Sequence, residues 1–219
     1  MPRSSDILFV SSNRHKYEEA RSVLGGLGIA VDFAESELLE IQSDSLADVA
    51  LAKARDASAA FGRPVLVEDD GLFVDGLNGF PGPYSSYVLR TIGLAGMLRL
   101  LAGSGDRRAR FVAAVAYDDG GGDGDGGGSN SRSNGNNNSS RRSRRSSSSS
   151  NGPGRVFEAS VCGVIPGASR GDGWGYDPLF VPTGHALTFA EMGARRKAGI
   201  SHRALALGAF AGWYRGGMP

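Results

Sequence analysis

The sequence is short of cysteine, of long hydrophobic runs and of net charge. A single cysteine, Cys162, excludes an internal disulfide and fits a reducing compartment. Because it lies in an alternating apolar segment, we predict a buried thiol rather than a nucleophile. No apolar run approaches membrane-spanning length and no hydrophobic leader follows the first residues, so we expect a soluble, cytoplasmic protein that does not contact membranes.

The formal net charge is +1 over 219 residues, which gives no bias toward nucleic acid as a partner. Residues 119–154 consist mostly of glycine, serine, asparagine and arginine, with almost no apolar side chains. Such a segment cannot offset the entropy of ordering itself. We therefore predict a single α/β domain over residues 1–219, with a disordered insertion at about 119–154 at a hairpin tip. A passive linker is the favoured interpretation, and RNA contact by its arginine-serine portion is the alternative.

Residues 65–87 form the stretch around which the chain is organised. A short apolar run, Val65–Val67, predicts a buried strand, and Glu68, Asp69 and Asp70 follow it directly. Open α/β sheets bind ligands just past the carboxyl ends of their strands, where these acids would lie. Adjacent carboxylates repel one another, and a divalent cation would remove that cost. A solvated acidic turn is the alternative that this stretch alone leaves open.

A second candidate site lies near the N-terminus. Ile7–Val10 predicts a strand, Ser11–Asn13 offers helix-capping side chains, and a helix is predicted over Arg14–Leu24. A strand, a polar turn and a helix start direct backbone N–H groups and the positive helix end at one point, and Lys16 adds a full charge. This arrangement suits an anion, although an ordinary capped helix with a surface lysine would show the same pattern.

Two further segments carry candidate ligand groups. Residues 171–178 alternate glycine with Trp174 and Tyr176, which suits a loop that stacks a base, or an aromatic plug under a loop. Lys197, His202 and Arg203 lie just before or at the start of the final helix. A basic cluster at a helix start opposes the helix dipole, which indicates a bound anion or polar ligand.

The remaining elements follow from periodicity and capping residues. The predicted elements are a strand ending near residues 38–40, a helix from Ser45 to Phe61, a type II turn at Phe80–Pro83, a helix from Pro83 interrupted near Gly93, strands at Ala109–Tyr117 and Arg155–Ile165, a capping box at Thr188–Glu191, and a final helix at Ala204–Tyr214 capped by Ser201.

Taken together, five blocks of the chain resemble the non-canonical purine nucleoside triphosphate pyrophosphatases, also called inosine triphosphate pyrophosphatases. They occur in the family's order and spacing. The blocks are SSNRHKYEE (11–19), LLEIQ (38–42), VEDDGLFVDGLNGFPGPYSSY (67–87), GWGYDPLF (173–180) and TFAEMGARRKAGISHRALAL (188–207).

The resemblance implies an elongated, two-lobed α/β fold with a mixed β-sheet, flanking helices and a central nucleotide-binding cleft, usually in a homodimer. It implies Mg²⁺-dependent hydrolysis of ITP, dITP or XTP to the monophosphate and pyrophosphate, which cleanses the nucleotide pool. A related pyrophosphatase acting on other modified or pyrimidine nucleotides is the nearest alternative.

The resemblance also assigns residues. Asp69 matches the catalytic proton acceptor, and whether it acts directly or through the metal stays open. Glu40, Asp69 and Glu68 would hold one or more Mg²⁺ ions. The implied substrate-binding residues are Ser11, Ser12, Asn13, Arg14, His15, Lys16, Lys53, Asp70, Trp174, Gly175, Tyr176, Asp177, Lys197, His202 and Arg203.

Arg203 offers a physical reason for base selection. Its guanidinium only donates hydrogen bonds, so it satisfies a 6-oxo group but faces the amino group of adenine donor to donor. A buried donor without a partner costs enough to discriminate strongly. This reasoning explains discrimination between ITP and ATP. It does not explain discrimination between ITP and GTP.

Overall fold

The computed structural model describes residues 6–121 and 154–216. Most of the predicted insertion at 119–154 lies outside the described residues, so its disorder and its contact with RNA stay predictions. Within the described ranges, no helix is long and apolar enough to cross a bilayer.

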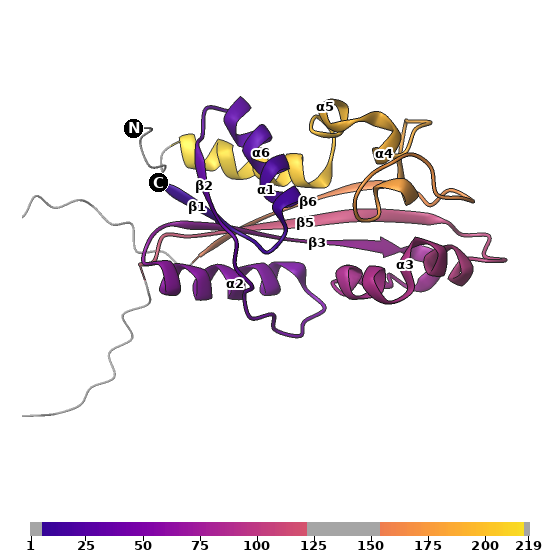
Figure 1. Cartoon of the computed structure of the whole chain (residues 1–219), viewed down its shortest axis with the longest axis horizontal. Coiled ribbons are helices and arrows are strands. Elements are labelled where there is room, and N and C mark those ends of the chain that lie inside the picture. Colours follow the sequence, from indigo (N-terminus) through magenta and orange to yellow (C-terminus); the bar gives the residue numbers. More distant parts are fainter. Residues whose placement is uncertain (1–5, 122–153, 217–219) are drawn as a thin grey trace, which may run out of the picture.

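The described residues form an elongated molecule around one mixed seven-stranded sheet (Figure 1). The strand order is β2-β1-β3-β5-β6-β7, and β4 pairs with β3 outside this path. β1 is parallel to its two neighbours, whereas every other pair is antiparallel. The strands are β1 (Ile7–Val10), β2 (Val31–Ala34), β3 (Val65–Val74), β4 (Pro81–Gly82), β5 (Arg108–Asp118), β6 (Arg155–Val164) and β7 (Val181–Pro182). The predicted mixed α/β fold is confirmed.

Helices cover both faces of the sheet. α1 and α6 lie on one face with the short α4 and α5, whereas α2 and α3 lie on the other side of the sheet in Figure 1. Side chains of β1 alternate accordingly: Ile7 and Phe9 pack in the core beside α6, and Leu8 and Val10 pack against α2. The helices are α1 (Arg14–Gly26), α2 (Leu46–Phe61), α3 (Ser85–Leu100), α4 (Phe189–Met192), α5 (Ala194–Lys197) and α6 (His202–Arg215), with 3₁₀ turns η1 (Asp75–Leu77) and η2 (Asp177–Leu179).

Capping side chains begin the helices where the sequence predicted them. Asn13 accepts from the amide of His15, Ser45 from that of Asp48, and Ser201 from that of Ala204. Thr188 and Glu191 form the predicted capping box. Gly93 has φ +65° inside α3, so the predicted interruption of that helix is confirmed.

The acid-bearing strand is longer than predicted. β3 continues to Val74, so Glu68, Asp69 and Asp70 lie inside it rather than past its end. The reason is the antiparallel pairing with β5, which runs without a break from Val65 opposite Asp118 to Val74 opposite Ala109. The prediction that the acids follow the strand was therefore wrong.

Four smaller predictions were also wrong. β2 ends at Ala34, because β1 offers it only four residues to pair with, so Glu40 lies in an irregular segment. Pro81–Gly82 forms β4, and the amide of Tyr84 donates to the Pro81 carbonyl at 3.1 Å, one residue later than the predicted turn. α3 begins at Ser85 rather than Pro83. Cys162 is exposed, because β6 alternates and this side chain faces away from the core.

The contact between β3 and β4 depends on a glycine. A Cβ at Gly71 would lie 2.4 Å from the Gly82 carbonyl oxygen and 2.9 Å from its carbon. These atoms belong to the backbone and cannot move aside as a side chain tip would. We therefore expect Gly71→Ala to lower the free energy of unfolding by about 1–3 kcal/mol, measured by urea denaturation.

Gly208→Ala is the matched control, because Gly208 is helical and a Cβ there would have nothing within 4 Å. It should leave stability unchanged or raise it by up to about 1 kcal/mol. Equal stability of the two variants would contradict the close approach of β3 and β4.

Candidate active site

A cavity of about 690 Å³ lies where one edge of β3 has no strand beside it. β1 pairs with β3 only at Val65 and Leu66, and β4 pairs only at Leu72 and Phe73. Between these pairs the edge is open, and the three acids lie there. β2 and β3 flank β1 on opposite sides, so the carboxyl end of β1 is also the switch point at which open α/β sheets bind ligands.

The cavity brings together most of the predicted site residues, although they come from six separate segments. Arg14 and His15 are not among its lining: Arg14 pairs with Glu18 at the surface, and the His15 ring stacks on Trp174 with centroids 5.6 Å apart. The predicted residues that line it are Ser11, Ser12, Asn13, Lys16, Glu40, Lys53, Glu68, Asp69, Asp70, Trp174, Gly175, Tyr176, Asp177, Lys197, His202 and Arg203.

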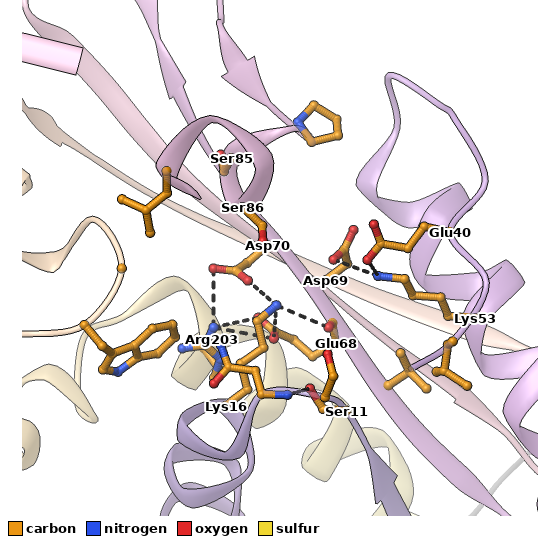
Figure 2. A pocket seen from close by; sticks show the side chains of 18 of the residues that line it. Ser11, Lys16, Glu40, Lys53, Glu68, Asp69, Asp70, Ser85, Ser86 and Arg203 are labelled. Atoms are coloured by element: carbon orange, nitrogen blue, oxygen red, sulfur yellow. Dashed lines mark hydrogen bonds and ion pairs between the residues drawn. The ribbon is translucent and has the colours of Figure 1, made fainter. Parts of the chain in front are cut away.

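Strand alternation sends the three acids in two directions. Glu68 and Asp70 point toward Lys16 and Arg203, whereas Asp69 points toward Lys53, as Figure 2 shows. Glu68 Oε1 lies 3.1 Å from Arg203 Nη2, and Glu68 Oε2 lies 3.1 Å from Lys16 Nζ. Glu68 is therefore enclosed by two cations on the face opposite Asp69.

Lys16 and Asp70 hold each other in the charged state. Burial favours the neutral lysine, but Asp70 and Glu68 outweigh it and raise the pKa of Lys16 above its ordinary value. Burial likewise favours the neutral acid, but Lys16 and Arg203 hold the pKa of Asp70 well below its usual range. Both groups are thus charged at neutral pH.

Asp69 has a different environment. Lys53 Nζ lies 3.3 Å from Asp69 Oδ1 and 2.5 Å from Glu40 Oε1. Burial raises the pKa of Asp69 above its ordinary value, and Lys16 and Lys53 only partly oppose that effect. Asp69 is consequently a stronger proton acceptor than a solvated aspartate.

The carboxylates of the cavity indicate whether a divalent cation could bind there. No group of three or more metal-ligating side chains occurs within residues 6–121 and 154–216. However, Glu40 and Asp69 both reach the same ammonium group, and the side chain of Glu40 is 70% exposed. Mg²⁺ is commonly held by one or two carboxylates together with waters and substrate phosphates. Glu40 and Asp69 fit that requirement, whereas Glu68 lies on the other face of β3.

The opposite end of the cavity is organised by Glu19, which sequence reasoning missed. Its carboxylate lies 2.7 Å from Lys197 Nζ and 2.5 Å from Arg203 Nη1, and it accepts from Trp174 Nε1 at 3.1 Å. Burial opposes its charge, but Arg203 and Lys197 lower the pKa of Glu19. Glu19 is three residues from Lys16, so helical spacing placed it on the same face of α1.

His202 is a buried ring in the lining of the cavity. It is 2% exposed and stacks on Phe111 with centroids 4.5 Å apart, and its Nε2 lies 3.7 Å from Asp70 Oδ2, beyond normal hydrogen-bond distance. Burial lowers its pKa, so the ring is neutral and offers one donor and one acceptor. Arg203 Nε is buried without a hydrogen-bond partner among the described residues. The side chains of His202 and Arg203 line the cavity, whereas these nitrogen atoms lie beneath its surface.

Sequence reasoning also missed part of the cavity wall. These residues lie on β1, on the irregular segment after β2, on β3 and β5 and around the start of α3; some fall within the matched blocks 38–42 and 67–87, and the others belong to none of the matched blocks. They are Val10, Ser36, Glu37, Leu38, Leu39, Val67, Pro83, Ser85, Ser86, Leu89, Arg90 and Phe111.

The chain is similar to known proteins over nearly its whole length. A protein of Methanopyrus kandleri named dITP/XTP pyrophosphatase is 40% identical over 210 residues, which cover 95% of this chain and 96% of that protein. One of the same name from Ignicoccus hospitalis is 43% identical over 209 residues, 93% of each chain. The solved structure of a HAM1 protein from Coxiella burnetii has a TM-score of 0.71 at 25% identity and covers 96% of this chain and 98% of its own.

The match extends to a family model. The model described as the Ham1 family aligns with residues 7–213, which include every side chain of the cavity. The chain belongs to the Ham1 family.

Proposed function

We propose that the protein hydrolyses nucleoside triphosphates to the monophosphate and pyrophosphate, with ITP, dITP and XTP as preferred substrates and Mg²⁺ as cofactor. The observation that carries this proposal is the cavity at the open edge of β3, where lysines, arginines and carboxylates converge beside the start of α1. Its volume of about 690 Å³ suits a nucleotide. The relatives named dITP/XTP pyrophosphatase support the same reaction.

The charge balance of the cavity supports a metal requirement. Five cationic side chains line it, against six carboxylates. A polyanionic triphosphate therefore meets no net positive charge from the side chains, and a divalent cation would supply what is lacking. When bound at Glu40 and Asp69, Mg²⁺ would neutralise phosphate charge. Glu68 has a separate role in this proposal, because it compensates Lys16 and Arg203.

The phosphate chain is proposed to bind at the start of α1. Ser11, Ser12 and Asn13 lie at its positive end, and Lys16 and Lys53 stand on either side of the acids. Both lysines contact carboxylates in this structure, and phosphate oxygens would take over part of those contacts. Such preorganised donors stabilise the charge that develops during phosphoryl-type displacement.

Asp69 is proposed to accept the proton of the attacking water. Burial raises its pKa, which brings its basicity closer to neutral pH than that of an ordinary aspartate. Its position on the edge of β3, between Lys16 and Lys53, is where the scissile phosphate would lie. Little covalent assistance is needed for this reaction beyond positioning and charge neutralisation.

The base is proposed to bind between Trp174 and the start of α6. Arg203 and Lys197 are donor-only groups there, held in place by Glu19. A 6-oxo purine would satisfy the free donors, whereas the amino group of adenine would leave them unpaired. Assembly as a homodimer stays a prediction of the family resemblance.

Substrate choice and metal dependence can be tested together. We expect pyrophosphate release from ITP, dITP and XTP with Mg²⁺, at least about a hundredfold slower turnover of ATP, and loss of activity in EDTA that added Mg²⁺ restores. A coupled assay of pyrophosphate over a panel of triphosphates measures this. Equal turnover of ATP and ITP would refute the specificity, and preference for a pyrimidine would identify a related enzyme instead.

The role of Asp69 can be tested by Asp69→Asn. Turnover should fall by about 10²–10⁴-fold, because the amide cannot accept the proton. Burial raises the pKa of Asp69 in the folded state, so its ionised form destabilises the protein above that pKa. The variant should therefore be as stable as the wild type or more so in thermal unfolding at pH 7.

Asp56→Asn is the matched control, since Asp56 lies exposed on α2 and outside the cavity lining. It should retain wild-type turnover. Full activity of Asp69→Asn would rule out its proposed role, whatever the behaviour of the control.

A further inference from the structure

One cation of the cavity differs from the others. Lys16, Lys53, Lys197 and Arg203 each contact at least one carboxylate. Arg90 also lines the cavity, but no carboxylate of the described residues lies within ion-pair distance of it. Arg90 is exposed, so water solvates its charge, and it can bind an anion without first giving up a carboxylate partner.

The position of Arg90 is fixed by the beginning of α3. Ser85 Oγ accepts from the amide of Leu72 at 2.8 Å and donates to the Gly82 carbonyl at 2.6 Å, which ties the helix start to β3 and β4. The Tyr176 hydroxyl also donates to the Ser85 carbonyl at 3.1 Å. Ser86, the next residue, and Arg90, one turn beyond it, line the cavity from this anchored helix.

Ser86 orients the arginine. Arg90 Nη1 donates to Ser86 Oγ at 2.8 Å, a contact between residues four apart on the helix. A guanidinium has five N–H donors, so this bond leaves most of them available. The remaining planar pair suits bidentate binding of a phosphate group.

The wall that carries Arg90 bounds the open edge of β3 on the side away from α1. The edge is limited by the β1–α1 turn at one end and by β4 and α3 at the other, and Figure 2 shows Ser86 near Asp70, across from Ser11 and Lys16. An anion held at the start of α1 therefore faces α3. Of the residues lining the cavity, Arg90 is the cation on that helix.

We propose that Arg90, oriented by Ser86, binds the part of the phosphate chain that leaves as pyrophosphate. This inference rests on the proposed function. The terminal phosphates carry the highest charge density of the substrate, and they need a cation whose charge no carboxylate already balances. Arg90 thus contacts the phosphate chain from the side opposite Lys16 and the start of α1. It is a substrate-positioning residue and takes no part in proton transfer.

Calorimetric titration with inorganic pyrophosphate in Mg²⁺ buffer tests the proposal directly. Arg90→Ala should weaken pyrophosphate binding about tenfold or more, because it removes charge-assisted hydrogen bonds. Binding of inosine monophosphate should be unchanged. In steady-state assays, KM for the triphosphate should rise by a similar factor with kcat changed by less than about threefold, and Arg90→Lys should recover part of the loss.

Arg99→Ala is the matched control, because Arg99 lies exposed on the same helix and outside the cavity lining. It removes the same charge and should bind pyrophosphate as the wild type does. Unchanged pyrophosphate binding in Arg90→Ala would overturn the proposal, as would an equal loss of monophosphate binding or an equal effect of Arg99→Ala. A wild-type protein that binds pyrophosphate but hydrolyses no triphosphate would refute the proposed function and leave the Arg90 site standing.

Discussion

The site depends on cationic side chains that balance the charge of the acids at the open edge of β3. Glu68 is buried inside β3 with the partly buried Asp70 beside it, and a buried charge left without its partner costs about 3–5 kcal/mol. Lys16 from α1 and Arg203 from α6 supply that compensation from two distant parts of the chain. The ion pairs therefore join the first and last helices to the central strand. The contacts that hold these elements together therefore also bring the site residues together.

This compensation explains how the cavity can exist without its substrate. Four of its cations are already balanced by carboxylates, so the empty site carries little net charge. In the proposed function, phosphate oxygens would take over carboxylate contacts of the lysines, and the freed carboxylates could hold a divalent cation. Exchange of this kind costs less than exposing a bare cluster of like charges.

Local features of the site were predictable from the sequence, and long-range ones were not. Capping by Asn13 and Ser201 depends on a few neighbouring residues, so the starts of α1 and α6 could be read directly. The length of β3 depends on β5, some forty residues later, which continues the ladder past the acids. Consequently the opposite directions of Glu68 and Asp69 could not be foreseen. Arg90 and Phe111 reach the cavity only through tertiary packing, and no motif marks them.

Specificity in such a site follows from what the protein leaves unpaired. Arg203 Nε is buried without a hydrogen-bond partner among the described residues, and His202 Nε2 has only a 3.7 Å contact with Asp70, although buried polar atoms are usually satisfied. The free-energy cost of removing these groups from water is already present before a nucleotide binds. A base with matching hydrogen-bonding groups would offset that cost on binding, and a mismatched base would not. Glu19 and Phe111 hold these groups rigidly, which keeps them from finding partners elsewhere. In the proposed function, discrimination between bases would thus be built into the fold before any nucleotide binds.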